Sequence, residues 1–184
     1  MQNGISVDTS MGFTPLEGLV MGTRCGDIDP AIPLHVMESK RLSTTEMDRI
    51  LNKESGLYGL TGGDSDMRTI EKKAARSSER HILALKIFAK RIKKYIGAYT
   101  AVMNGLDALV FTAGIGENSP EIRRLICEGL DYFGILIDDL KNKKNDRYIH
   151  GGTTPVMVIK TNEELSIARE TVRVLSKEAV RVEA

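Results

Sequence analysis

The sequence predicts an α/β fold in which helices flank a mixed or parallel sheet. Two short apolar segments, residues 106–112 and 155–160, have the length and the Gly or Pro boundaries of buried strands. A segment with helical character follows each strand, and a long amphipathic segment at residues 78–105 precedes the first one. The order strand, helix, strand, helix is the one that lays helices against a sheet.

The first thirty residues are expected to contain one strand and a long loop. Ile5 and Val7 alternate with polar residues as in a strand, and Asn3-Gly4 is typical of a hairpin turn. A strand whose partner should precede the first residue suggests a chain that starts partway through a domain. Residues 8–33 are rich in Gly, Thr, Asp and Pro and too long for a simple connector, so they predict a functional loop region.

Three helical segments follow this loop. Residues 34–52 have helical character, and Ser43 and Glu46 are spaced as in a capping box. Residues 56–74 are expected to form a glycine-rich loop and then a helix. In residues 78–105 apolar side chains recur at steps of three and four, which predicts one long amphipathic helix. Its basic residues are expected to form a solvated face: Lys86, Lys90, Arg91, Lys93 and Lys94.

The strand at residues 106–112 leads into the sequence AGIGEN and then SPE. Gly114 and Gly116 allow a tight turn, Ser119 is a good N-cap, and Pro120 suits the first helical position. A strand, a glycine turn and a helix N-terminus hold phosphates in several folds. The same glycines would also serve a plain tight turn, so this stretch alone leaves nucleotide binding and a structural turn equally open.

The C-terminal third is expected to alternate between regular and exposed segments. Residues 121–133 predict a helix that ends at Gly134, and residues 134–139 predict a short strand. Residues 141–152 are polar and basic, as in an exposed turn or hairpin. After the strand at 155–160, residues 161–177 predict a final amphipathic helix.

Composition bounds the classes of function. The chain has 184 residues, of which 41% are hydrophobic and 28% charged, as in one globular domain. Its net charge of +1 and its lack of basic clusters with interleaved aromatics give no reason to expect nucleic acid. No apolar run predicts a membrane span, and no signal peptide is visible. Because Cys25 and Cys127 show neither metal spacing nor a disulfide framework, we expect a cytoplasmic protein.

Four blocks of sequence carry a specific resemblance. DTSMGFTPLEGLVMGTRCGDIDP, at residues 8–30, resembles a signature of the acetokinase family. GGDSDMR, FTAGIGEN and KTNEELSIARET, at residues 62–68, 111–118 and 160–171, resemble three further family blocks in the same order. The resemblance implies the ribonuclease-H-like C-terminal lobe of a two-lobe kinase, in the superfamily of sugar kinases, actin and heat-shock ATPases. It implies that this lobe fills residues 1–184 and that the N-terminal lobe is absent.

The resemblance also assigns roles to individual residues. Arg24 matches an arginine that stabilises the transferring phosphoryl group, a role that suits a planar guanidinium; without the resemblance, a surface ion pair with Asp27 or Asp29 is favoured. Glu163 matches a glutamate associated with Mg²⁺ or Mn²⁺, acting directly or through water. Two nucleotide segments are implied, and they comprise Asp66, Met67 and Arg68 in the first and Gly114, Ile115, Gly116, Glu117 and Asn118 in the second.

Other candidate residues are expected to be structural. His35, His81 and His150 match no catalytic histidine of the family. Cys25 has no base visible in the sequence, and Cys127 lies within a predicted helix, so neither is expected to be a nucleophile.

The implied reaction moves a phosphoryl group between ATP and acetate, giving acetyl phosphate and ADP, within a homodimer. Propionate or butyrate kinase is a close alternative, because the acyl pocket would lie largely in the other lobe. A non-catalytic nucleotide-binding or dimerisation module is the alternative of a different class. The family's catalytic aspartate, histidines and phosphate loop have no counterpart in these residues, so the chain alone is expected to be inactive.

Overall fold

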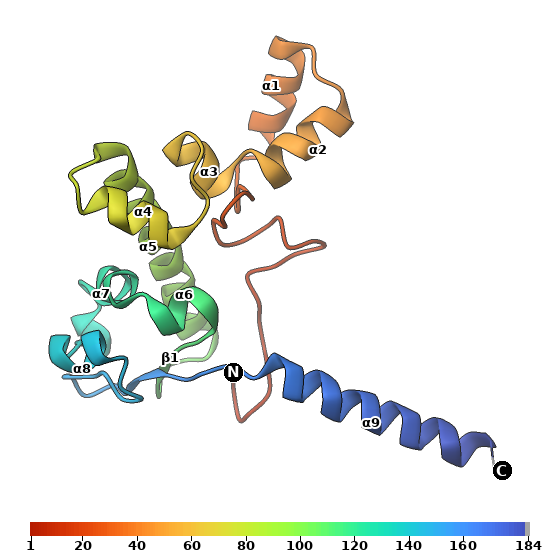
Figure 1. Ribbon diagram of the computed structural model, residues 1–184, viewed down its shortest axis with the longest axis vertical. Coiled ribbons are helices and arrows are strands. Elements are labelled where there is room, and N and C mark those ends of the chain that lie inside the picture. The colour runs from red at the N-terminus through yellow and green to blue at the C-terminus, as the bar shows by residue number, and fades with distance from the viewer. Residues whose placement is uncertain (183–184) are drawn as a thin grey trace.

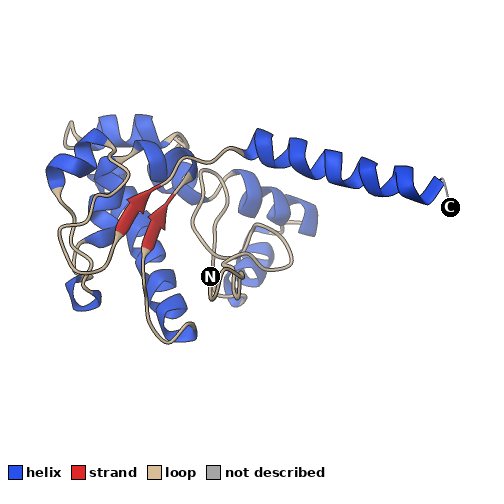
Figure 2. Ribbon diagram, turned by 90° about the horizontal axis from the view of Figure 1, so that it is seen from below, coloured by secondary structure: helices blue, strands red, loops and turns tan. Residues whose placement is uncertain are grey.

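The computed structural model describes residues 1–182, so the last two residues of the predicted 1–184 lobe lie outside it. Helices dominate the described chain, with one small sheet (Figures 1 and 2). From the N-terminus the elements are α1 (Ala31–Lys40), α2 (Thr44–Lys53), α3 (Gly56–Thr61), α4 (Met67–Ala74), α5 (Glu79–Val102), β1 (Leu109–Phe111), α6 (Ala113–Asn118), α7 (Pro120–Cys127), the 3-10 turn η1 (Asp131–Phe133), α8 (Asp139–Lys144), β2 (Val156–Val158) and α9 (Glu163–Val182).

The two strands are parallel and lie side by side (Figure 2). Leu109 pairs with Val156, and Phe111 pairs with Val158. Parallel neighbours need a crossover connection, and here α6, α7 and α8 supply it. The predicted α/β class and both strand positions are therefore confirmed, although the sheet is smaller than the mixed sheet expected from the sequence.

Helix α5 organises the hydrophobic core. It packs mainly on α3, α4 and α7, not on the sheet as the sequence suggested. Leu85, Phe88, Ala89 and Ile96 are buried on its inner face, so the predicted apolar stripe belongs to the protein's own core. The same continuous core includes Val156 and the rest of both strands' buried residues, so the sheet forms one body with α3, α4, α5 and α7.

The basic face of α5 is only partly solvated. Lys86, Lys90 and Lys94 are exposed, as predicted. Arg91 instead donates to the carbonyl of Asp27 and forms an ion pair with its carboxylate at 2.8 Å. This contact fastens the N-terminal loop region onto α5.

Two predicted elements in the N-terminal third are wrong in part. Ile5 and Val7 form no strand; Gln2 and Ile5 bond to each other across the Asn3-Gly4 turn, with N···O distances of 2.8 and 3.0 Å. The predicted helix at 34–52 is broken into α1 and α2. Arg41 adopts a left-handed conformation at the break (φ 56°), where it satisfies the last carbonyls of α1.

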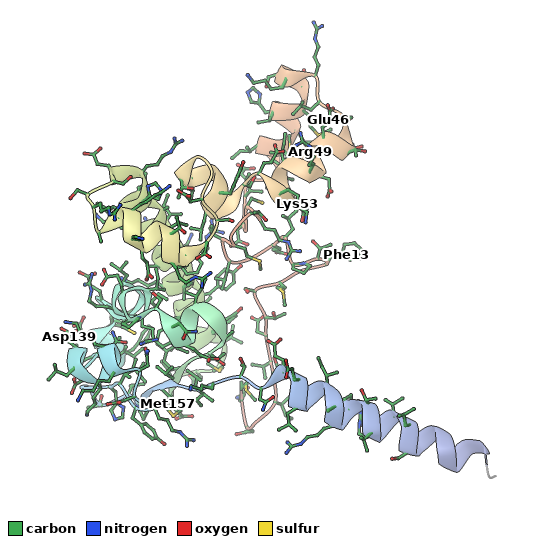
Figure 3. The ribbon with its side chains drawn as sticks, in the orientation of Figure 1. Phe13, Glu46, Arg49, Lys53, Asp139 and Met157 are labelled. Carbon is green, nitrogen blue, oxygen red and sulfur yellow. The ribbon has the colours of Figure 1, made fainter. Side chains whose placement is uncertain are left out.

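The predicted capping box explains why α2 restarts after this break. The Ser43 side chain accepts from the Glu46 backbone, and the Glu46 carboxylate accepts from the Ser43 backbone at 2.7 Å. Figure 3 shows Glu46, Arg49 and Lys53 along α2, away from the part of the chain that holds the sheet.

The region between the strands is more helical than predicted. The helix expected at 121–133 ends at Cys127, and Gly134 instead ends η1 in a left-handed conformation (φ 73°). Residues 134–139 form no strand; only an isolated bridge joins Ile137 to His150. The polar stretch at 141–152 contributes to α8. Its N-cap is the Asp138 carboxylate, which accepts from the Leu140 backbone at 3.0 Å.

Helix α9 projects away from the other elements (Figure 1). The predicted final helix is confirmed, and it extends beyond the expected limit at residue 177. In the part of the chain that the structure describes, no helix is both long and apolar enough to cross a membrane.

Candidate functional site

A cavity of about 530 Å³ lies where the start of α4 meets α6. The two predicted nucleotide segments, far apart in the sequence, meet here. The lining residues are Asp66, Met67, Arg68, Glu71, Gly114, Ile115, Asn118 and Ser119. Gly116 and Glu117 lie in the same helix but do not line the cavity, and the nucleotide-binding role of all these residues stays a prediction.

The α4 wall begins with an N-cap. The Asp66 carboxylate accepts from the Arg68 backbone at 2.8 Å, while the Arg68 guanidinium contacts it at 2.6 Å. The hydrogen bond from the Arg68 side chain, helped by the one from its backbone, lowers the pKa of Asp66 to about 2. Asp66 is therefore a pure hydrogen-bond acceptor at neutral pH. Met67 turns inward and is buried, which anchors this wall to the core.

The α6 wall leaves β1 through a left-handed residue, Ala113 (φ 58°). The glycines that follow have different structural reasons. A Cβ on Gly116 would lie 3.3 Å from the carbonyl carbon of Phe111, so glycine lets α6 sit close to the strand. A Cβ on Gly114 would meet nothing within 4 Å, so glycine leaves open space on the cavity side.

Two lining residues were missed as site residues by the sequence analysis. The Ser119 hydroxyl donates to the Glu71 carboxylate, which joins the α4 wall to the α6–α7 junction. Ser119 also accepts from the Ile122 backbone at 3.0 Å, as the predicted N-cap of α7. Glu71 follows Met67 by one helical turn, and this spacing is the signal that could have placed it on the same face.

Arg24 lies outside this cavity, in a loop that packs on the start of α3. Its backbone carbonyl accepts from Met21 at 3.2 Å, and its guanidinium contacts the Met21 sulfur at 3.8 Å. Among the described side chains it makes no ion pair, neither with Asp27 nor with Asp29. The alternative interpretation of Arg24 as a surface ion pair is therefore not what the structure contains.

Glu163 lies in the first turn of α9 and is exposed. Within residues 1–176, where side chains are described, no group of three or more His, Cys, Asp or Glu residues could hold a metal ion. The segment before Glu163 is nevertheless tied to α6. The Glu117 carboxylate accepts from the Thr161 backbone at 2.9 Å and from its hydroxyl at 3.1 Å, and the backbone bond is the main cause of a lowered Glu117 pKa.

His81, His35 and the two cysteines occupy structural or surface positions. His81 is buried, with Nε2 2.8 Å from the Asp64 carboxylate and Nδ1 2.6 Å from the Ser78 hydroxyl, so it joins the loop before α4 to the start of α5. His35 is exposed on α1. Burial raises the pKa of the Cys127 thiol to about 12 and also raises that of Cys25.

Comparisons with known proteins agree on one family. A family model described as the acetokinase family matches residues 1–169. The acetate kinase of Dictyoglomus thermophilum is 57% identical over 181 residues, which cover 96% of this chain and 45% of the relative. The acetate kinase of Methanosarcina thermophila is 53% identical over 182 residues, covering 97% and 45%.

Solved structures give the same result. The crystal structure of the Porphyromonas gingivalis acetate kinase matches with a TM-score of 0.88 and 40% identity, over 94% of this chain and 45% of that one. A propionate kinase from Francisella tularensis matches with a TM-score of 0.88 and 47% identity, over 91% and 44%. The chain therefore spans about half the length of the curated relatives it matches.

Proposed function

This chain belongs to the acetokinase family, and from that membership we propose that it is the nucleotide-binding half of a carboxylate phosphotransferase. The proposed reaction moves the γ-phosphoryl group of ATP to acetate. A carboxylate oxygen of acetate attacks the γ-phosphorus, the bond to the β-phosphate oxygen breaks, and ADP leaves with that electron pair. No protein nucleophile takes part.

The meeting of the two predicted nucleotide segments in one cavity is the observation that carries this proposal. A volume of about 530 Å³ lies within the usual range for small-molecule sites. Met67 and Ile115 offer apolar contact for a base. The Arg68 guanidinium is exposed, and its planar face can stack on the base while its edge pairs with Asp66. Asp66 suits the ribose hydroxyls because it is ionised, and Asn118 can hydrogen-bond the base.

Arg24 is proposed as the catalytic residue of this half. A transferring phosphoryl group spreads negative charge over its oxygens, and positioned cations stabilise it. The absence of an ion pair on Arg24 among the described side chains leaves its guanidinium available for that charge. Arg24 lies outside the adenosine cavity, which agrees with a role at the phosphates and not at the base.

Glu163 is proposed as a magnesium-associated carboxylate. Mg²⁺ keeps several waters and takes one or two protein carboxylates together with substrate phosphates. One exposed glutamate fits that donor set, and Mn²⁺ would accept the same oxygens. When bound, the metal would offset negative charge on the nucleotide phosphates.

Propionate is a second candidate substrate, favoured by the 47% identity to a propionate kinase.

We also propose a cytoplasmic homodimer. The cysteines are free, which fits a reducing compartment. The apolar stripe of α5 is internal, so α9, which exposes Leu165, Ile167, Val172 and Leu175, is the better dimer element. Light scattering that shows a monomer at tens of micromolar chain would contradict the dimer.

Calorimetry with ADP tests the nucleotide site on this chain. Gly114→Leu puts a side chain into the open space of the cavity, and we expect it to raise the Kd at least tenfold. Gly97→Leu is the matched control, because a Cβ at Gly97 on α5 also meets nothing within 4 Å. It should leave the Kd within about twofold, and equal effects of both variants would contradict the assigned site.

A chimera tests the catalytic role. In it, this chain replaces the matching half of the Dictyoglomus thermophilum acetate kinase, to which it is 57% identical. Arg24→Ala should lower turnover by about 10²–10³ with little change in the KM for ATP. Arg76 is an exposed arginine on the surface, so Arg76→Ala is the control and should keep turnover.

A hydroxamate assay on the unfused chain with acetate and ATP should show no activity, because half a cleft cannot position both substrates.

A further inference from the structure

Arg123, on α7, is a buried arginine that the proposed reaction does not use. Its side chain is fully buried, with 0% of its surface exposed. No carboxylate pairs with it among the described residues; all of its partners are neutral oxygens. Nε donates to Asn142 Oδ1 at 2.7 Å, and Nη2 donates to the Asn142 carbonyl at 2.8 Å and to Asn145 Oδ1 at 2.6 Å.

The remaining donor of Arg123 reaches α6, the helix that forms one wall of the candidate site. Nη1 donates to the carbonyl oxygens of Gly116 at 2.7 Å and of Glu117 at 3.1 Å, in the last turn of α6. These carbonyls belong to the set that a helix end leaves without intrahelical partners. A guanidinium stays protonated even though burial lowers the pKa of Arg123, so these are charge-assisted bonds.

Helix α6 needs such a support because it stands between two cavities. One side lines the candidate nucleotide cavity. Glu117 and Asn118 line a second cavity of about 650 Å³, so Asn118 borders both. A helix of six residues that contains two glycines is not stable by itself. Its position therefore depends on what holds its two ends, which are β1 at the start and Arg123 at the end.

We propose that Arg123 is a positioning residue that fixes α6 as a wall of the nucleotide cavity by holding the Gly116 and Glu117 carbonyls against α8. The inference rests on the proposed nucleotide function of that cavity. Asn142 and Asn145 accept the other Arg123 hydrogen bonds and so connect α6 to α8 through the guanidinium. Asn142 also donates to the Pro120 carbonyl at 2.9 Å, which joins α7 to α8. Burying a charge without an ionic partner costs folding free energy, and the role of Arg123 in positioning α6 accounts for the presence of this buried charge.

Three variants test the proposal. Arg123→Met removes every donor but fills the space with an apolar side chain, and Arg123→Lys keeps the charge with fewer directed bonds. Asn145→Gly removes one acceptor while it suits the left-handed backbone there (φ 54°), so this variant keeps the test open if the arginine variants do not fold. Ile149→Ala is the control: the residue is fully buried but bonds to no part of α6.

The first measurement is hydrogen exchange of the α6 amides in the chain without nucleotide. We expect exchange at least tenfold faster in Arg123→Met and a smaller increase in Asn145→Gly, with no selective change in Ile149→Ala. Unchanged α6 exchange in folded Arg123→Met, or in Asn145→Gly where the arginine variants do not fold, would overturn the inference. Because this measurement needs no ligand, it judges the positioning role even if the wild-type chain fails to bind ADP.

The second measurement is ADP affinity by calorimetry, at a temperature where each variant is folded. We expect Arg123→Met to raise the Kd at least fivefold, Arg123→Lys to fall between it and the wild type, and Ile149→Ala to stay within about twofold despite lower thermal stability. Equal affinity in Arg123→Met and wild type would overturn the inference. A wild-type chain without ADP affinity would instead count against the proposed function, and the exchange data alone would then decide on Arg123.

Discussion

Gly56, the first residue of α3, is where the loop of Arg24 meets the rest of the chain. Its backbone is left-handed, with φ 58°. A Cβ there would lie 2.5 Å from the Arg24 carbonyl oxygen and closer still to that of Met21. The Leu57 amide donates to this Met21 carbonyl at 2.9 Å. Gly56→Ala must therefore strain the backbone and push the Arg24 loop away from α3.

Two terms set the size of the effect. A left-handed L-residue costs about 1–2 kcal/mol. Displacing the Met21 carbonyl from its buried amide partner adds about 1–3 kcal/mol. We expect a loss of about 3 kcal/mol in the free energy of unfolding. For a chain of this size, such a loss corresponds to a fall of about 6–12 °C in Tm.

Differential scanning calorimetry on three matched variants separates these terms. Gly129→Ala has the same kind of backbone (φ 72°) but meets nothing within 4 Å, so only the strain remains and Tm should fall by about 2–8 °C, less than in Gly56→Ala. Gly97→Ala, in α5, has neither problem and should raise stability by about 0.5–1 kcal/mol. If Gly56→Ala matched Gly129→Ala, the close approach of the Arg24 loop to α3 would be refuted.

Three further outcomes are expected. Ser43→Ala removes the N-cap of α2 and should cost about 1 kcal/mol, seen as a Tm lower by about 2–4 °C; an unchanged Tm would contradict the capping box. Burial raises the pKa of the Cys127 thiol to about 12 and also raises that of Cys25. A thiol reagent at about pH 8 should therefore modify the folded chain far more slowly than the denatured chain, and equal rates would contradict the burial of these two thiols. Folding lowers the pKa of Asp66 from 3.8 to about 2, chiefly through the hydrogen bond from Arg68. The stabilisation from ionised Asp66 is therefore complete above the unfolded pKa and is lost as pH falls through the folded pKa. The Tm difference between wild type and Asp66→Asn should be constant above about pH 5 and shrink below about pH 3, and a change between about pH 5 and 8 would refute the assignment.

The elements that the sequence predicted well are those set by local patterns. Helix α5 has an uninterrupted 3.6-residue apolar period, and the α2 and α7 starts have capping residues, Ser43 and Ser119, whose bonds are local. Both strands are short apolar runs with clear boundaries. No Gly or Pro marks the break at Arg41, and apolar residues continue on both sides of it, so the only local signal was the capping box of Ser43 and Glu46, which starts a new helix.

In the candidate site, too, features with a local sequence pattern were predicted and features that depend on distant residues were not. The two predicted nucleotide segments were visible because each is a contiguous motif, although they meet only in the folded chain. Glu71 and Arg123 have no motif, and their importance comes from partners distant in the sequence, Ser119 for one and Asn142 for the other. The predicted strand at 134–139 failed for a related reason, since an apolar run becomes a strand only where a partner edge is available, and here only Ile137 finds one.

The parallel pairing of β1 with β2 also decides when the cavity can form during folding. Helices α3, α4 and α5 pack on neighbours close in the chain, so they can assemble early. The strand pair must instead close a long loop that contains α6, α7 and α8, and such non-local contacts form slowly. Because α6 leaves directly from β1, its final placement belongs to that late event. In stopped-flow refolding, most of the helical signal should therefore return before a fluorescent adenine nucleotide can bind.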